Sequence, residues 1–277
     1  MLNLLPYGPL DYLDVDAIQR ELHANVAHGC APDTFILWEA QHIYTAGRRT
    51  ADRDIPDTSV PVISMDRGGS VTYHGPGQLI VYPIVKVRSP QDVVAFVRST
   101  ERAIEAAMLS AFGIQTSQVR GRSGAWILDP EQIDRKLCAI GIKFASEVTM
   151  HGLALNVATD LSMFERVIPC GLSDAGVTSL QELGVTAELQ DVAEALVPEL
   201  ARAYAPFLER SGSTAVNSFE HCVQLNAQKW LSCAPLLRKN QELNACTGVA
   251  WKPRGADQVE SGSASSIVKA TEEASES

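Results

Sequence analysis

The sequence predicts an α+β fold: a mixed β-sheet with flanking helices that cover it mainly on one face. Short β-branched or aromatic segments, each bounded by Gly, Pro or Asp, follow one another in runs, as strands do. Longer segments with apolar residues at helical spacing stand between these runs, without the strict strand–helix alternation of a parallel sheet. The 277 residues, 45% of them hydrophobic, can bury one large core or two modest ones.

The first half of the chain should contain two helices and three strands. A helix is expected from about residue 14 to 28, with Asp14 as its N-cap and Gly29 as its stop signal. Three strands should follow at 34–39, 60–65 and 79–85. The clearest helix spans 90–112 and ends at Gly113. Its inward side should consist of Val93, Val94, Val97, Ile104, Met108 and Phe112.

The second half predicts three more strands, at 125–128, 136–145 and 148–158. A helix from about 187 to 208, behind Thr186, should bury Leu189, Val192, Leu196, Leu200 and Phe207. We expect a catalytic domain over 1–210, a C-terminal extension over 211–252 with a helix near 218–237, and a disordered tail over 253–277. In the tail, Gly, Ala, Ser and acidic residues leave too little apolar surface to fold.

Charge and cysteine content exclude several classes of function. A formal charge of −10 argues against nucleic-acid binding as the main activity. No apolar run approaches the roughly 20 residues that span a bilayer, so we expect a cytoplasmic protein without membrane contact. The cysteines include no Cys-x-x-Cys pair, and His221, Cys222, Cys233 and Cys246 fit no familiar metal pattern. We therefore expect reduced thiols, no metal and no cofactor.

Residues 67–78, Arg-Gly-Gly-Ser-Val-Thr-Tyr-His-Gly-Pro-Gly-Gln, carry the densest functional chemistry of the chain. The glycines allow positive φ angles or a close approach to a ligand, while Arg67 and His74 supply polar contacts that a structural turn does not need. A catalytic or ligand-binding role is therefore favoured over the alternative, a Gly/Pro-rich hairpin with incidental polar residues.

Cys170 stands in Pro-Cys-Gly, a turn that presents its sulfur, whereas Cys138 lies within an apolar run. A nucleophilic thiol needs a partner near neutral pH, and Lys136, His74 and His151 are candidates. Lys136 begins an apolar strand, where low-dielectric surroundings disfavour its ammonium form. It could take the thiol proton or hold the thiolate as an ion pair; the alternative is an edge-strand lysine with its amine in water.

Four ordered motifs resemble those of the lipoyl(octanoyl) transferase family. They are Arg-Gly-Gly-x-x-Thr-x-His-Gly-Pro-Gly-Gln at 67–78, Lys-x-x-Ala-x-Gly-Ile at 136–142, His-Gly-x-Ala-x-Asn-Val at 151–157 and Pro-Cys-Gly at 169–171. The resemblance covers about residues 10–210. It implies the catalytic-domain fold of the biotin/lipoate protein ligases, and Cys138 departs from it by adding a second thiol beside Lys136.

The resemblance also implies an activity: octanoyl transfer from octanoyl-acyl carrier protein to a lysine of lipoyl domains, without ATP, as the first step of endogenous protein lipoylation. The acceptors would be the lipoyl domains of 2-oxoacid dehydrogenase E2 subunits and the glycine cleavage H protein. Cys170 would be the nucleophile and Lys136 the group that activates it, with His151 as an additional contact. The acyl site would be lined by Arg67, Gly68, Gly69, Ser70, Val71, Thr72, Tyr73, His74, Ala139, Ile140, Gly141, Gly152, Leu153 and Ala154.

Acidic carrier proteins would require a local basic patch, for which Arg48, Arg49 and Arg53, then Arg120 and Arg122, are the candidates. Three alternative functions remain open at this point. An ATP-dependent lipoate or biotin protein ligase would share the fold, a non-catalytic acyl-binding protein would keep the cavity without turnover, and a cysteine hydrolase would release free fatty acid.

Overall fold

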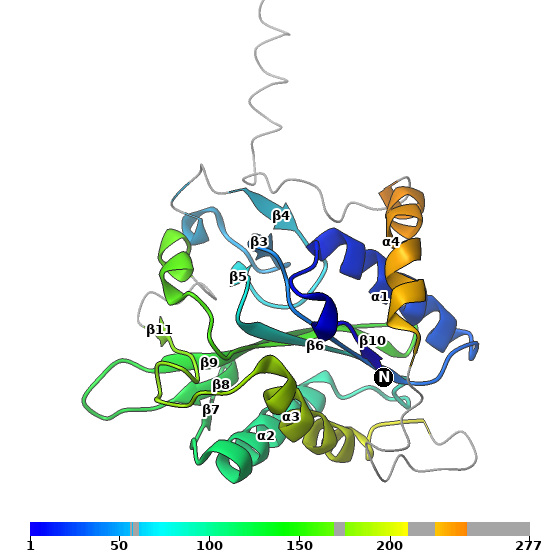
Figure 1. Cartoon of the computed structure of the whole chain (residues 1–277). Coiled ribbons are helices and arrows are strands. Elements are labelled where there is room, and N and C mark those ends of the chain that lie inside the picture. Colours follow the sequence, from blue (N-terminus) through cyan, green and yellow to red (C-terminus); the bar gives the residue numbers. More distant parts are fainter. Residues whose placement is uncertain (56, 58–60, 169–174, 210–224, 243–277) are drawn as a thin grey trace, which may run out of the picture.

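A computed structural model describes residues 1–55, 57, 61–168, 175–209 and 225–242 of the chain. Its centre is a mixed sheet of eight strands in the order β1-β2-β6-β10-β9-β8-β7, with β11 added to β9 (Figure 1). The β1–β2 and β11–β9 pairs are parallel and the others are antiparallel. The strands are β1 (Leu2–Asn3), β2 (Thr34–Trp38), β6 (Gln78–Ile84), β7 (Ser117–Val119), β8 (Arg122–Ile127), β9 (Arg135–Ala145), β10 (Val148–Asn156) and β11 (Gly176–Val177).

A second, three-stranded sheet lies against one face of the first. Its order is β4-β3-β5, with β3 (Ile43–Ala46), β4 (Val62–Ser64) and β5 (Thr72–His74). It has its own small apolar cluster around Tyr44 and Tyr73, to which Phe164 of the 3-10 helix η3 (Leu161–Arg166) contributes. Two further 3-10 turns are η1 (Leu5–Tyr7) and η2 (Asp52–Asp54).

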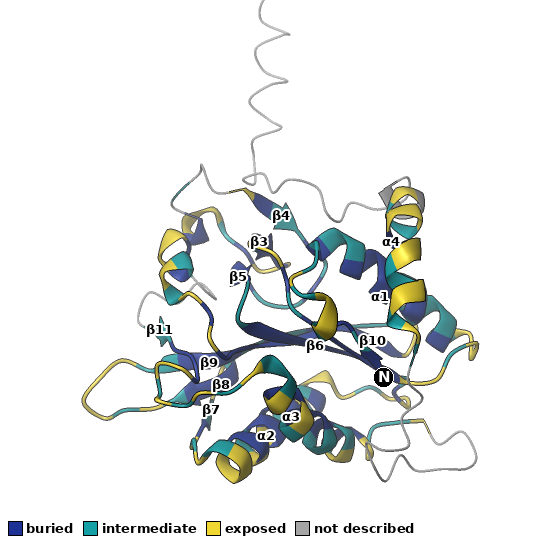
Figure 2. Cartoon of the chain, viewed as in Figure 1, coloured by how far each residue is buried: buried dark blue, intermediate teal, exposed yellow. Residues whose placement is uncertain are grey.

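In the described part of the chain, four α-helices cover the main sheet, two on each face (Figure 1). They are α1 (Tyr12–Ala27), α2 (Val93–Phe112), α3 (Leu189–Tyr204) and α4 (Ala227–Glu242). Side chains alternate along β6, so that Leu79 and Val81 join α2 and α3 while Ile80 and Tyr82 join α1 and α4. The buried strands lie between these layers in Figure 2, and the prediction of a sheet covered mainly on one face is wrong.

The helix ends show where the sequence patterns were misread. Asp11 caps α1, accepting hydrogen bonds from the backbone N–H groups of Leu13 and Asp14, so the helix begins before the expected Asp14 cap. Gly113 ends α2 in the left-handed conformation, as expected. Val93 and Val94, expected to face inward, are 42% and 71% exposed because they lie in the first turn of α2, before its apolar stripe reaches the core.

In the second half, α3 begins after Glu188 rather than Thr186, and its apolar side packs inward as expected. The helix predicted near 218–237 corresponds to α4, which packs on α1 through the buried Ala234. The domain boundary at residue 210 stays a prediction, and the tail over 253–277 lies outside the described residues. Within the described part of the chain, no helix combines the length and the apolar character needed to cross a bilayer.

Candidate active site

A cavity of about 260 Å³ opens between the main sheet, the start of α1 and the segment that leads into β5. Its volume is slightly below the usual range of about 300–1,000 Å³ for small-ligand pockets. Three sequence motifs that lie far apart in the chain meet around it. The predicted site residues that line it are Arg67, Gly69, Ser70, Val71, Thr72, His74, Lys136, Ala139, Ile140, Gly141, His151, Gly152, Leu153 and Ala154.

Two of the predicted site residues that the structure describes, Tyr73 and Gly68, do not line the cavity. Tyr73 points the other way, because side chains alternate along β5 and the cavity takes Thr72 and His74. Its hydroxyl lies 2.6 Å from Nδ1 of His42, in the apolar cluster of the small sheet. Gly68 does not line the cavity, and Cys170 lies outside the described residues.

The floor of the cavity is formed by the paired strands β9 and β10. Gly141 faces Gly152 across the ladder, and the next pairs are Ile140 with Leu153 and Ala139 with Ala154. A Cβ atom on Gly152 would lie 2.0 Å from the carbonyl oxygen of Val81, so no larger residue fits this position. Residues 139–141 and 152–154, which belong to different sequence motifs, are therefore neighbours in space, and their small residues leave room above the sheet.

Lys136 reaches the cavity from the end of β9. Its side chain is buried, with the residue 7% exposed, and its Nζ lies 4.5 Å from the centre of the Trp126 ring. Such a distance over an indole face is typical of a cation–π contact. The side chain of Lys136 is therefore enclosed by protein, and the alternative interpretation, an edge-strand lysine with its amine in water, is wrong.

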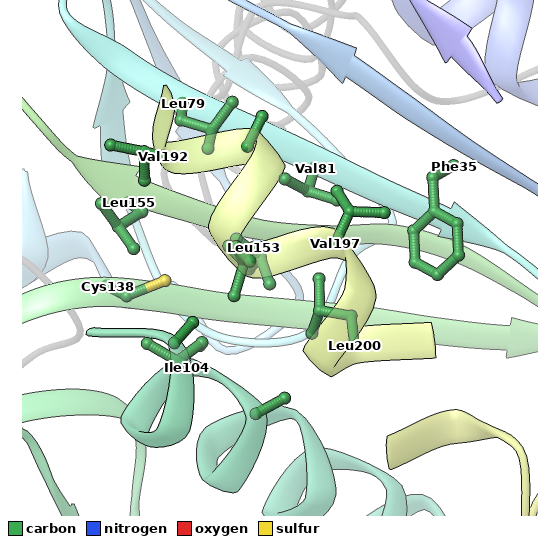
Figure 3. Close-up of a cluster of buried hydrophobic side chains, with 14 of the residues drawn as sticks. Phe35, Leu79, Val81, Ile104, Cys138, Leu153, Leu155, Val192, Val197 and Leu200 are labelled. Atoms are coloured by element: carbon green, nitrogen blue, oxygen red, sulfur yellow. The ribbon is translucent and has the colours of Figure 1, made fainter. Parts of the chain in front are cut away.

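Cys138, the second thiol near Lys136, lies on the opposite face of the sheet. It is fully buried among Ile104, Leu155 and Val192, in the core between the sheet and helices α2 and α3 (Figure 3). Burial raises the pKa of this thiol well above its ordinary value. Cys138 therefore serves packing, and its thiolate is too scarce at neutral pH to compete as a nucleophile.

His74 holds a buried hydrogen-bond acceptor at the cavity wall. Its Nδ1 lies 2.8 Å from Oε1 of Gln78, whose own amide nitrogen donates to Oδ1 of Asn156. Nδ1 must therefore carry the proton, and Nε2 is a buried acceptor with no partner among the described residues. Burial, aided by the positive charge of Arg67, lowers the pKa of His74 to about 3, so the ring is neutral at physiological pH.

His151 is held by a polar network beneath the cavity. Its backbone N–H donates to Oε1 of Gln19, whose amide nitrogen lies 3.2 Å from Nδ1 of the same histidine, and its Nε2 lies 2.9 Å from Asp66. These contacts hold the residue at a φ of 57°, which is unusual outside glycine. Burial lowers the pKa of His151 against the opposing hydrogen bond to Asp66.

Asp66 joins this network to two cations. Arg20 and Lys143 both bind its carboxylate, the latter at 2.5 Å. Burial alone would raise the pKa of Asp66, but hydrogen bonds from His151 and Arg20 lower it below its usual range. The carboxylate is thus charged, and it fixes the ring of His151 at the cavity wall.

Sequence reasoning missed several residues of the cavity wall. Tyr12 and Tyr82 line it, and the hydroxyl of Tyr82 donates to that of Tyr12 at 2.9 Å. Burial raises the pKa of Tyr12 to about 12. Asp54 accepts a hydrogen bond from Ser70 and so ties η2 to the segment before β5. The two tyrosines lie among apolar helix and strand positions, where no local pattern separates them from core residues.

Three of the five arginines proposed as a basic patch border the cavity. Arg49 and Arg53 come from the segment after β3 and Arg122 from the start of β8. The side chain of Arg53 is 84% exposed, as expected for a residue at a surface opening. Arg48 and Arg120 are exposed but do not line the cavity.

Comparison with known proteins defines the class. Residues 11–201 match the family model described as "Lipoyl protein ligase A/B catalytic domain". A putative lipoate protein ligase from T. acidophilum with bound lipoic acid superposes with a TM-score of 0.58 at 12% identity, over 87% of this chain and 92% of that one. Lipoate-protein ligase A bound with ATP gives 0.56 at 15% identity, over 86% and 93%. The chain belongs to the lipoyl protein ligase A/B catalytic-domain family, and the predicted fold is confirmed.

Within that family the sequence is similar to octanoyltransferases. The octanoyltransferase of Clavibacter sepedonicus is 50% identical over 204 residues, covering 72% of this chain and 88% of the relative. That of Thermobifida fusca (strain YX) is 47% identical over 207 residues, covering 73% and 87%. The chain is therefore an acyltransferase of the octanoyltransferase group, as the four motifs predicted.

Proposed function

We propose that this enzyme takes an octanoyl group from octanoyl-acyl carrier protein, holds it as a thioester on Cys170 and passes it to a lysine of lipoyl domains. One observation carries the proposal: the motifs at 67–78, 136–142 and 151–157 converge on one cavity, in a chain 50% identical to an octanoyltransferase. A lysine enclosed at the cavity wall and a floor of glycine and alanine suit a base beside an acyl chain.

The first half-reaction forms the acyl-enzyme. The amine of Lys136, in its neutral form, takes the proton of the Cys170 thiol, and the thiolate attacks the carbonyl carbon of the carrier thioester. The carbonyl oxygen carries the negative charge of the tetrahedral intermediate. When the intermediate collapses, the bond to the carrier sulfur breaks, and the carrier thiolate takes the proton back from Lys136.

The second half-reaction transfers the acyl group to the acceptor. The neutral amine of the lipoyl-domain lysine attacks the thioester carbonyl of Cys170, and Lys136 receives the proton that the amine loses. Collapse breaks the carbon–sulfur bond and returns Cys170 as a thiolate, to which Lys136 returns the proton. A thioester is already activated toward an amine, so this route needs no ATP.

Backbone N–H groups near Gly68, Gly69 or Gly141 are our candidates for stabilising the oxyanion. A Cβ atom at Gly141 would lie 2.8 Å from the carbonyl oxygen of Gly68, so substitution at 141 would disturb packing as well. At Gly68 the nearest atom, the carbonyl oxygen of Ile142, would be 3.2 Å away. Gly68→Ala is therefore the milder test: it keeps the N–H donor but should displace it slightly and lower kcat more than substrate binding, and unchanged turnover would argue against a donor whose exact position matters.

The acceptor and donor proteins would dock at the cavity opening. Arg49, Arg53 and Arg122 form a positive rim there on a chain whose net charge is −10, which suits acidic carrier proteins. We propose acyl carrier protein as donor, with lipoyl domains of 2-oxoacid dehydrogenase E2 subunits and of the glycine cleavage H protein as acceptors.

Intact-mass analysis tests the proposal. The purified protein, incubated with octanoyl-acyl carrier protein and no ATP, should gain one octanoyl group that peptide mapping places on Cys170. Adding a lipoyl domain should move the group to that domain. Cys170→Ser should remain unmodified, whereas Cys138→Ala, the matched control, should acquire the adduct as the native enzyme does.

Other outcomes would point to the competing activities. Lipoyl-domain modification that requires ATP and free acid would identify a ligase, and release of octanoic acid without transfer would identify a hydrolase. Transfer to the lipoyl domain without any adduct on Cys170 would contradict the proposed intermediate.

A further inference from the structure

The strand pair β8–β9 contains an irregularity at the proposed base. Ala125 pairs with Cys138, but the next residue, Trp126, pairs with Lys136. Leu137 is therefore one residue too many on β9, which is the definition of a β-bulge. The bulge lies where β9 exchanges its neighbour β10 for the short strand β11.

The bulge decides which way Lys136 points. Leu137 and Cys138, though adjacent in sequence, both lie in the core beside α2 and α3. Lys136 lies on the opposite face, with Ala139 and the cavity. In a regular strand Lys136 would share the face of Cys138, because side chains two residues apart point the same way. Without the extra residue, the amine would be directed into an apolar core.

Gly124 of β8 packs against this bulge. Its φ is 130°, and a Cβ atom there would lie 2.5 Å from the carbonyl oxygen of Cys138 and 3.3 Å from Cε of Lys136. Only glycine fits both the angle and the space. The stem of Lys136 therefore runs directly over the backbone of Gly124 before its Nζ reaches Trp126.

The backbone N–H of Gly124 donates to Oε1 of Glu101 at 3.0 Å. Glu101 belongs to α2, lies beneath the sheet and is 1% exposed. Its other carboxylate oxygen accepts a hydrogen bond from Nη1 of Arg98. Nη1 and Nη2 of this arginine also donate to the carbonyl oxygen of Val119, at 3.5 and 3.4 Å. Burying a charged carboxylate in an apolar core is costly, and an apolar residue at this position would avoid the cost.

We propose that Glu101 is a positioning residue: it anchors the backbone of Gly124, keeps the bulge in β9 and so directs Lys136 into the cavity. The inference rests on the proposed function of Lys136, and it concerns a residue that does not touch the substrate. Neither Glu101 nor Gly124 belongs to the four motifs, so the family resemblance gives no reason to single them out.

The test compares Glu101→Gln with Glu101→Leu. Glutamine keeps a carbonyl oxygen for the Gly124 N–H, whereas leucine removes the acceptor. In single-turnover reactions with octanoyl-acyl carrier protein, Glu101→Leu should lower the rate of adduct formation by about 100-fold, the cost of a misplaced catalytic group. Its Kd for the carrier should stay within about twofold, since binding does not use Glu101, and Glu101→Gln should recover most of the rate.

Two controls separate positioning from general damage. Ile104→Val, on the same helix and in the same core, should lower the melting temperature and leave the single-turnover rate near that of the native enzyme. Gly124→Ala disturbs the bulge from the other side and should reproduce the Glu101→Leu defect. Equal rates for Glu101→Leu and Ile104→Val at matched stability would overturn the inference.

A crystal structure of Glu101→Leu gives a readout that does not depend on turnover. Loss of the bulge, or movement of Lys136 Nζ away from Trp126, supports the inference even if the native enzyme never acquires an adduct. An unchanged bulge and lysine overturn it. Failure of the native enzyme to form the adduct is, by contrast, evidence against the proposed function alone.

Discussion

The two faces of the main sheet differ in how they use the same strands. Toward α2 and α3, strands β9 and β10 contribute Cys138, Leu153 and Leu155 to a continuous apolar core (Figure 3). Toward the cavity, they contribute small residues, and around these lie buried polar groups: Arg67, His74, Lys136 and His151. The face toward α2 and α3 stabilises the fold through packing, whereas the desolvated polar groups on the cavity face lower its stability. Substitutions on the two faces should therefore have separable effects on folding and on chemistry.

The largest effect should come from the cavity face. Lys136→Arg should abolish formation of the Cys170 adduct, with a loss of about 1,000-fold or more, because a guanidinium does not accept a proton at neutral pH. Intact-mass time courses with octanoyl-acyl carrier protein measure the rate. An adduct that forms at the native rate would show that the lysine acts through its charge or not at all.

On the packed face, Leu196→Ala should leave chemistry intact and reduce stability. Leu196 is fully buried in α3, and truncating such a side chain lowers the free energy of unfolding by about 2–5 kcal/mol. Urea denaturation measures the loss, while kcat at 25 °C should stay close to native. A large fall in kcat with unchanged stability would show that the two faces are coupled.

His74 should make the cavity face sensitive to acid. Its pKa is about 3 in the folded protein against 6.5 when exposed, so the unfolded chain binds the extra proton first. The contribution of neutral His74 to the free energy of unfolding is fully present above about pH 6.5 and is lost as the pH drops toward 3. Between pH 7 and 5, native protein should lose about 2 kcal/mol more than His74→Gln in urea titrations. Parallel losses in the two proteins would contradict the assignment of a neutral buried ring.

The smallest effect should come from the cavity rim. Replacing Arg49 and Arg53 together by Glu should raise KM for the carrier by about three- to tenfold at low salt, with kcat unchanged, because exposed charges act mainly on association. The shift should shrink as salt is added. Arg48→Glu, on the same segment but away from the cavity wall, is the matched control for Arg49→Glu alone and should change KM less than that single variant. Equal, salt-independent effects would argue against a docking role for the rim.

The sequence was sufficient for most of the architecture because apolar periodicity reports packing directly. All six predicted strands and all four helices exist, and the glycine stop of α2 lies where it was expected. The prediction failed on the number of covered faces, and it missed the short strands β1, β3, β5, β7 and β11 and with them the second sheet. Alternating apolar residues such as Leu79 and Ile80 show that both sides of β6 are buried, but they do not show which helix covers each side.

For the cavity, motifs located the backbone that approaches a ligand but not every side chain around it. Tyr73 belongs to the motif at 67–78 but points away from the cavity, because side chains alternate along the three-residue strand β5. Tyr12 and Asp66 lie outside every motif. Tertiary structure brings Tyr12 of α1 to the cavity wall, and Asp66 is connected to the site through its contact with His151. The direction of Lys136 depends on a bulge, and a bulge arises from pairing between strands, which a single-strand pattern does not reveal.

Strand β5 has a consequence for how the enzyme should fail when heated. Its three residues place Tyr73 in the small sheet's own apolar cluster and His74 at the cavity, so the position of the imidazole depends on that cluster. This cluster is separate from the two larger cores and much smaller than either. A minor, self-contained unit opens at lower free energy than the body of a protein. Catalytic competence should therefore disappear at a temperature where the eight-stranded body is still intact.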